Sequence, residues 1–221
     1  MSSLAYNHPM TIGSVDVQSW VFPYLCGYRD KVPFFNPEES LVATKKALVF
    51  MQRVHAKGGR ILLVNTRPGL SQMVKITAAA TGWAYVNEHW IGGLMTNWHQ
   101  LKYSSHAFHK FHKWITPLMA HTVSFPRFTK AKKRFEGLKP LVRLPDVVVV
   151  LQATQTYKHI LHEGLSFGVP MVTCVDTYSP MTESHFPIPV NIHNPTFAYF
   201  LCKAFMVLFR KKVESKPRQR K

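Results

Sequence analysis

Short apolar runs alternate along this chain with segments whose apolar residues recur at helical spacing. Residues 61–64 are apolar throughout, apolar residues then follow one another at helical spacing over 70–78, and a second apolar run spans 84–86. Gly82 stands where glycine commonly ends a helix. A strand, a short helix and a strand at this spacing predict a βαβ unit, with parallel strands and a right-handed crossover.

The second half of the chain continues this alternation. Apolar runs at 147–151, 171–175 and 188–192 predict three more strands, and helices are predicted over 156–167 and 196–210. Five short strands alternating with helices indicate a doubly wound α/β fold.

Two further helices are predicted in the first half. Asn36 and Pro37 are the residue types that favour a helix N-cap and first helical position, and two acids follow in the first turn. A helix is therefore expected from there to about Lys57, and another is expected to begin near Trp98.

We interpret the chain as one domain with appendages. Residues 1–19 show no clear period and are assigned to an N-terminal extension, 20–210 to a single α/β domain, and 211–221 to a basic tail. Within the domain, 102–143 form a basic insertion that begins as a helix. Three prolines limit how much regular structure is expected in this insertion.

The positive charge is concentrated in two segments. The chain has 28 Lys and Arg against 11 Asp and Glu, a net charge of +17. Residues 102–143 have ten basic residues and one acid, residues 203–221 have eight and one, and the remaining ten basic and nine acidic residues nearly cancel. Charge concentrated in this way indicates a polyanionic partner, with nucleic acid the default.

Several protein classes do not fit the sequence. The apolar runs are far shorter than the ~20 residues of a membrane span, so no membrane partner is expected. No basic residue precedes Arg29, which argues against a secretory signal and an Arg-rich transit peptide. Cys26, Cys174 and Cys202 are odd in number and widely spaced, and we expect reduced, buried thiols.

Candidate catalytic and ligand-binding residues are few. The first strand-to-helix turn, 65–69, lacks the glycines of a nucleotide-binding loop, although Arg67 is expected to hold one backbone phosphate at the helix N-terminus. Asp176 follows a strand, and we interpret it as a loop cap in preference to a catalytic acid. The histidines at 106, 109 and 112 cannot share one helix face. We therefore expect no catalytic residue, no metal and no cofactor.

Aromatic residues are interleaved with the cations of the insertion. Rings in this setting either stack on unpaired bases or pack against the domain beneath a solvated charged surface, and both alternatives remain open. The residues concerned are Tyr103, Phe108, Phe111, Trp114, Phe125, Phe128 and Phe135.

Four segments resemble motifs of the bacterial-type small-subunit ribosomal protein S2 family. HWIGGLMTNW (89–98) resembles the family signature [RK]WLGG-x-[LM]TN[WF], and PYLCGYRDKVPFFNPEESL (23–41) resembles its entry into the first helix. LPDVVVV (144–150) and GVPMVTCVDT (168–177) resemble two of its strands. The resemblance implies a flavodoxin-like five-stranded parallel sheet, no catalysis and no small-molecule substrate. It also implies small-subunit rRNA and neighbouring ribosomal proteins as partners.

Departures from the family pattern indicate an organellar version. The family's N-terminal Gly-[VA]-His-[FL]-Gly-His motif is absent, and its long coiled-coil hairpin is reduced to 102–143. The chain is also more basic than bacterial members. We expect a mitochondrial protein, organelle-encoded or internally targeted, with the bacterial cytoplasm as the alternative.

The expected rRNA-binding residues come from the charge pattern and from the resemblance. The charge pattern indicates Arg67, Lys102, Lys110, Lys113, Arg127, Lys130, Lys132, Lys133 and Arg134, with Lys211, Lys212, Arg218 and Arg220 in the tail. The resemblance adds Arg29, Lys31, Trp90, Asn97 and Trp98 as contacts or scaffold.

Two other functions are compatible with the same residues. A flavodoxin-like enzyme would bind a small phosphorylated ligand at the carboxyl ends of the strands. An apolar pocket beside Asn65, Gln152 and Asp176 would favour it, and a filled cleft would count against it. An RNA-binding protein outside the ribosome would bind RNA tightly without associating with ribosomes.

Overall fold

The computed structural model describes residues 17–117, 125–153, 158–179 and 184–210. Two short strands, β1 (Leu25–Arg29) and β2 (Val32–Phe35), precede the main domain. The domain then follows in the order α1 (Pro37–Ala56), β3 (Ile61–Asn65), α2 (Ser71–Thr81), β4 (Ala84–Asn87), α3 (Trp98–Ile115), α4 (Pro126–Phe135), β5 (Val147–Ala153), α5 (Lys158–Ser166), β6 (Met171–Val175), β7 (Phe186–Pro189) and α6 (Pro195–Leu208). Short 3₁₀ helices span Ser19–Tyr24, Pro68–Leu70 and Glu136–Leu138.

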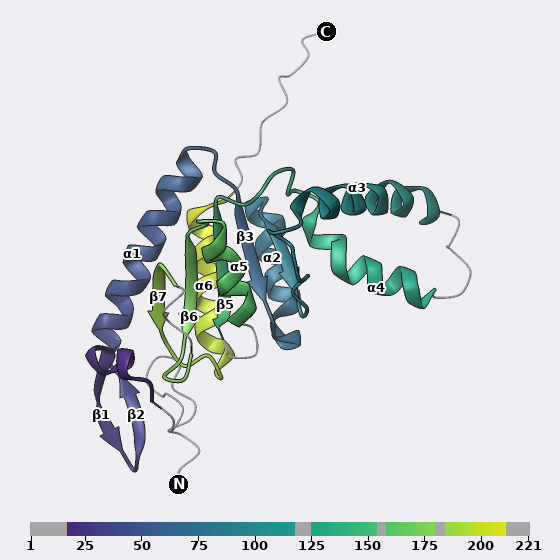
Figure 1. Cartoon of the computed structure of the whole chain (residues 1–221). Helices are drawn as coiled ribbons and strands as arrows, with labels where there is room; N and C mark the ends of the chain where they lie inside the picture. The colour runs from purple at the N-terminus through teal and green to yellow at the C-terminus, as the bar shows by residue number, and fades with distance from the viewer. Residues whose placement is uncertain (1–16, 118–124, 154–157, 180–183, 211–221) are drawn as a thin grey trace.

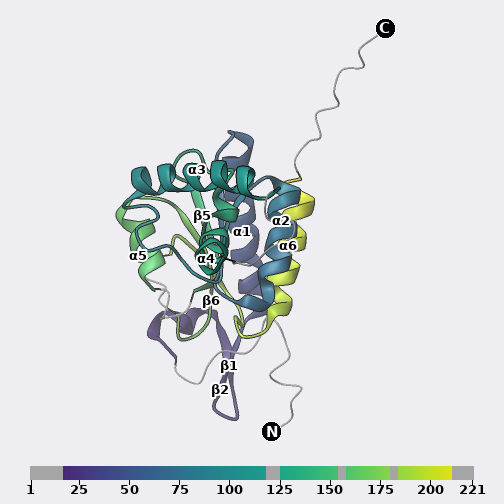
Figure 2. The same cartoon turned by 90° about the vertical axis from the view of Figure 1, so that its right-hand side faces the viewer.

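The central sheet has five strands in the order β4-β3-β5-β6-β7, and all of its pairings are parallel. Counted along the chain, the strands lie in the order second, first, third, fourth, fifth, which is the flavodoxin-like order. The predicted doubly wound α/β fold is confirmed. The three helices α1, α2 and α6 cover one face, and α5 with the start of α3 covers the other. Figure 2 shows α5 on one side of the strands and α2 with α6 on the other.

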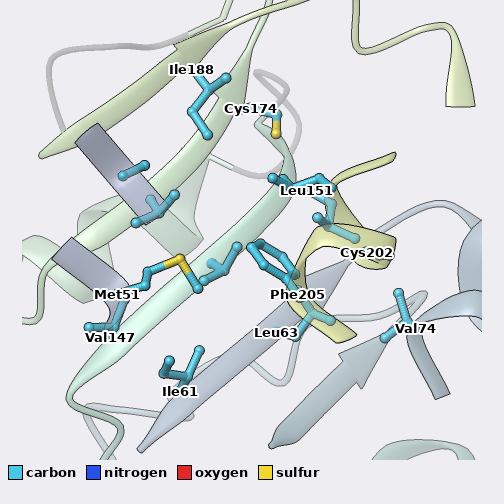
Figure 3. Close-up of a cluster of buried hydrophobic side chains, with 14 of the residues drawn as sticks. Met51, Ile61, Leu63, Val74, Val147, Leu151, Cys174, Ile188, Cys202 and Phe205 are labelled. Carbon is cyan, nitrogen blue, oxygen red and sulfur yellow. The ribbon is translucent and has the colours of Figure 1, made fainter. Parts of the chain in front are cut away.

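Both faces of the sheet are buried, which explains why its strands are continuous apolar runs. Alternate side chains still point to opposite faces. Leu63 of β3 therefore packs in the cluster with Met51 of α1 and Phe205 of α6 (Figure 3), whereas Leu62 belongs to the cluster on the other face.

Helix α1 starts where its sequence predicts. The Asn36 side chain accepts a hydrogen bond from the Glu38 amide at 3.0 Å, and Pro37 is the first helical residue. The buried face includes small polar residues as well as apolar ones. The hydroxyl of Ser40 donates to the Pro189 carbonyl at 2.6 Å and so ties α1 to the edge strand β7.

The strands β1 and β2 form a separate antiparallel hairpin that the hydrophobic pattern does not predict. Its turn residues, Asp30 and Lys31, have φ angles of 50° and 65°. Two left-handed residues fit a type I′ turn, but that turn is usually recognised by glycine, which is absent here. Cys26 in β1 is exposed, so the expectation that all three cysteines are buried is wrong for this one.

The insertion folds into a hairpin of two helices, α3 and α4, which Figure 1 shows projecting from the domain on the side away from α1. The resemblance implies a reduced helical hairpin over 102–143, but the periodicity of the sequence predicts only the first of its helices, because prolines commonly limit regular structure. Pro126 instead occupies the first helical position of α4, where the missing N–H costs nothing.

The last strand and the fifth helix differ in extent from the predictions. Strand β7 covers 186–189, not 188–192, because Pro187 and Pro189 are tolerated in an edge strand. Helix α5 covers 158–166, and the predicted start at 156 lies outside the described residues. Within the described part of the chain, no helix is long and apolar enough to cross a membrane.

Candidate nucleic-acid interface

Helices α3 and α4 are joined by aromatic side chains. The ring of Phe108 lies 5.9 Å from that of Phe128 and 5.7 Å from that of Phe135, measured between centroids. His112 stacks on Phe128 at 5.6 Å. These rings hold the two helices together and are not free to stack on bases. The aromatic residues of the insertion that remain exposed are Tyr103, Phe111, Trp114 and Phe125.

The outward face of α3 combines cations with exposed rings. Its buried residues, Trp98, Ser105 and Phe108, face the domain and α4. A run of exposed residues at three- and four-residue spacing occupies the opposite side, within about a third of the helix circumference. It consists of His99, Lys102, Tyr103, His106, Lys110, Lys113 and Trp114.

The five predicted cations of α4 are all exposed. They surround the helix except where Phe128 and Phe135 face α3, and they are Arg127, Lys130, Lys132, Lys133 and Arg134. Lys133 lies 3.7 Å from Glu88, and it is the one cation of this set with an acidic partner among the described residues. Glu136, the acid at the end of α4, pairs instead with Lys75 of α2 at 2.9 Å. The hairpin of α3 and α4, hereafter the basic hairpin, is therefore strongly positive.

The other predicted contacts lie elsewhere. Arg29 and Lys31 are exposed at the turn of β1 and β2, which Figure 1 shows at the opposite end of the molecule from the basic hairpin. Asn97 is exposed directly before α3. The tail residues lie outside the described residues. The predicted set therefore does not form one continuous surface.

Arg67 is engaged within the domain. Its Nη1 donates to the His193 carbonyl at 2.7 Å and lies 3.5 Å from the Ile192 carbonyl. The Gln152 side chain donates to the same Ile192 carbonyl at 2.6 Å. Across the sheet, Asn65 donates to the Asn87 side chain at 3.1 Å. The polar groups at the carboxyl ends of β3, β4 and β5 thus bond to one another or to backbone carbonyls.

Asp176 behaves as a loop cap. Its side chain accepts a hydrogen bond from the Thr177 amide at 2.8 Å and is buried. Its second oxygen lies 3.4 Å from Nε2 of His193, a partner that is distant in sequence and was not predicted. This hydrogen bond, together with the negative charge of Asp176, raises the pKa of His193 in spite of partial burial and the nearby Arg67.

We expect Asp176→Asn to lower the pKa of His193 toward the ordinary value of about 6.5. Because the folded-state pKa is raised, the contact stabilises the fold fully below about pH 6.5, and this contribution is lost as pH rises through the folded-state pKa. An NMR titration of the His193 imidazole in both proteins measures the shift. Equal pKa values in the two proteins would show that the contact is not formed in solution.

Trp90 and Trp98 are part of the scaffold. Trp98 is 7% exposed, and Trp90 is 9% exposed with its indole N–H donating to Glu163 at 2.9 Å. Glu163 is itself 8% exposed, and it also accepts from the amides of Met95 and Thr96 at 2.7 and 3.0 Å and from the Thr96 hydroxyl at 3.2 Å. Sequence reasoning missed Glu163, although it is the only acid in α5 and lies on that helix's buried face.

Burial shifts the pKa values of two cysteines and one histidine. Burial raises the pKa of the Cys174 thiol to about 12 and that of Cys202 to about 11, so both stay protonated at neutral pH. Burial beside α4 lowers the pKa of His109. No group of three or more metal-ligating side chains occurs among the residues that the structure describes.

The sequence is similar to one family of known proteins. A model of the ribosomal protein S2 family matches residues 16–207. The chain is 32% identical over 187 residues to the small ribosomal subunit protein uS2m of Marchantia polymorpha, covering 81% of this chain and 78% of the relative. It is 31% identical over 182 residues to uS2 of Idiomarina loihiensis and 30% identical over 184 residues to uS2 of Shewanella pealeana, each covering 76% of this chain and 72% of the relative.

Proposed function

Because this chain belongs to the ribosomal protein S2 family, it is a structural component of the small ribosomal subunit, and we propose that its basic hairpin binds small-subunit rRNA. The family is not enzymatic. The enzyme alternative is therefore set aside. Two questions remain: which surface of the protein binds RNA, and in which compartment the protein functions.

One observation carries the rRNA proposal: the outward face of α3 presents cations and rings together. Lys102, Lys110 and Lys113 have no acidic partner among the described residues, so they are available to neutralise phosphates. Neutralisation releases counterions and stabilises binding, most strongly at low salt. Tyr103 and Trp114, exposed by 72% and 63%, supply rings for stacking on unpaired bases.

The surface outside the basic hairpin is proposed to contact neighbouring ribosomal proteins. Exposed apolar side chains on α6 support this proposal, since an apolar surface does not bind phosphates. Phe200, Val207 and Leu208 of that helix are 54%, 79% and 43% exposed.

We further propose that the protein functions in mitochondria. The high positive charge, the shortened insertion and the similarity to uS2m of Marchantia polymorpha support this location. Bacterial relatives are almost as similar, so the bacterial cytoplasm is the alternative.

Sedimentation tests assembly into the small subunit and the mitochondrial location together. Mitochondrial and cytosolic fractions of the source cell are run on sucrose gradients at low and high salt and probed for this protein. We expect co-migration with the small subunit in the mitochondrial fraction, and partial release at high salt because the rRNA contacts are electrostatic. Protein found at the top of every gradient would contradict assembly into ribosomes, and co-migration only in the cytosolic fraction would contradict the mitochondrial location.

A further inference from the structure

A cleft of about 400 Å³ lies between α4 and the loop that follows β4. Its volume falls within the range of small-ligand sites. It lies at the carboxyl end of the edge strand β4. The lining residues are Asn87 at the end of β4, Glu88, His89, Trp90 and Ile91 from the loop, and Lys130, Lys133 and Arg134 from α4.

The α4 side of the cleft is suited to an anion. Lys130, Lys133 and Arg134 are three and four residues apart, so they share one face of the helix. Glu88 lies 3.7 Å from Lys133, but Lys130 and Arg134 have no acid within ion-pair distance among the described residues. An ammonium and a guanidinium left free on one wall form a good phosphate site, because the guanidinium binds phosphate oxygens in pairs.

The loop side of the cleft is suited to a flat, partly apolar group. Trp90 and Ile91 are mostly buried, and the parts that remain accessible line the cleft. The hydrogen bond from the Trp90 indole to Glu163 fixes this wall in place. His89 is exposed beside them and adds an imidazole ring. The exposed His89 ring can stack on a nucleobase, and the accessible parts of Trp90 and Ile91 add apolar contact.

Glu88 adds a third feature, a strained backbone. Its φ angle is 65°, in the left-handed region that residues other than glycine seldom adopt, and its amide donates to the Asn65 carbonyl at 2.8 Å. Such strain persists only where the surroundings enforce it and is concentrated at functional sites. The Glu88 carboxylate lines the cleft, 3.4 Å from the Ser71 hydroxyl and 3.7 Å from the Lys133 ammonium, and can accept a further hydrogen bond from the amino group of a base.

We propose that this cleft binds a single unpaired nucleotide of RNA, with its phosphate on Lys130 and Arg134 and its base against Trp90 and Ile91. The inference rests on the proposed rRNA binding and specifies which feature of the RNA the cleft accepts, namely an unpaired nucleotide. Charge on the basic hairpin alone attracts any RNA, whereas the cleft admits only a base that has left its helix. The same chemistry would also accept a free nucleotide, so the test includes both.

The test compares two double variants of the full chain that each remove two cations from α4. Lys130→Ala with Arg134→Ala alters the cleft, and Arg127→Ala with Lys132→Ala, which lie outside it, is the matched control. Fluorescence anisotropy measures binding to a single-stranded RNA of about 12 nucleotides and to a duplex of equal length. Circular dichroism melting confirms that both variants fold.

We expect the unaltered chain to prefer the single strand by about tenfold, the contribution of one well-stacked base. The cleft variant should lose the preference for single-stranded RNA. The control variant should bind both RNAs more weakly, to the same extent, and should therefore keep that preference. Equal behaviour of the two variants would overturn the cleft assignment while leaving rRNA binding intact. Absence of binding to either RNA at low salt would instead overturn the proposed function.

A second titration separates RNA from a free nucleotide. AMP and CMP are added to the full chain while tryptophan fluorescence is recorded. We expect only weak, millimolar binding, because one nucleotide lacks the neighbouring phosphates that reach the rest of the basic hairpin. Saturation at micromolar nucleotide that disappears in the cleft variant, without a preference for single-stranded RNA, would overturn RNA as the ligand.

Discussion

Glu163→Ala is expected to lower the free energy of unfolding by about 3–5 kcal/mol. The carboxylate is 8% exposed and accepts hydrogen bonds from the Trp90 indole, two backbone amides and the Thr96 hydroxyl. Alanine leaves these donors without their acceptor in a site that water hardly reaches. Each unsatisfied buried donor costs about 1–3 kcal/mol, although the loop relaxes and recovers part of the loss.

Urea unfolding monitored by circular dichroism measures the effect. Glu163→Gln should cost less than alanine, because the amide keeps one acceptor oxygen while it loses the charge. Glu136→Ala is the control: Glu136 pairs with Lys75 at the surface, both side chains are about 40% exposed, and the loss should stay below about 1 kcal/mol. A cost for Glu163→Ala as small as that of the control would contradict the role of Glu163 as the anchor of the loop over 90–96.

The sheet was predictable because parallel strands buried on both faces are read directly from sequence. The apolar runs at 61–64 and 147–151 fall within β3 and β5. Local structure was harder to predict where a residue type that is uncommon at that position forms a turn or begins a helix. The turn of β1 and β2 uses Asp30 and Lys31 in place of glycine, and Pro126 begins a helix in a segment where prolines argue against one.

The site was predictable in its location and not in its geometry. Counting charges locates the positive region between 102 and 143, since charge depends on composition alone. Contacts across long separations leave no periodic signal. Glu163 bonds to Trp90 across 73 residues, and Arg67 bonds to the His193 carbonyl across 126, so neither partner could be predicted from the spacing of residues in the sequence.

The structure divides the aromatic residues of the insertion into packed and exposed ones, and stacking of the exposed ones on bases stays a prediction. Phe108 and Phe128 pack inside the basic hairpin, while Tyr103 and Trp114 are exposed among its cations. Helical spacing separates the two groups, because residues three, four or seven apart share a face. For Phe128 this helical spacing could be used only after the structure had shown that Pro126–Phe135 is a helix.

Replacing Lys102, Lys110 and Lys113 together by alanine is expected to weaken RNA binding about a hundredfold at about 0.15 M salt. The three ammonium groups lie along the exposed face of α3, opposite its buried side, so their removal should leave the aromatic contacts between α3 and α4 intact. Removing one lysine–phosphate interaction should also reduce the slope of log affinity against log salt by about one. Titrations of a small-subunit rRNA transcript at several salt concentrations measure both quantities.

The matched control removes three exposed cations of helix α1, namely Lys45, Lys46 and Arg53. Figure 1 shows α1 on the side of the domain away from the basic hairpin. Both triple variants lower the net charge equally, so long-range attraction between protein and RNA weakens equally in each. Only the α3 variant should reduce the salt slope by about three, because only its cations contact phosphates. The same weakening in both variants would show that RNA responds to total charge and that the basic hairpin is not the binding surface.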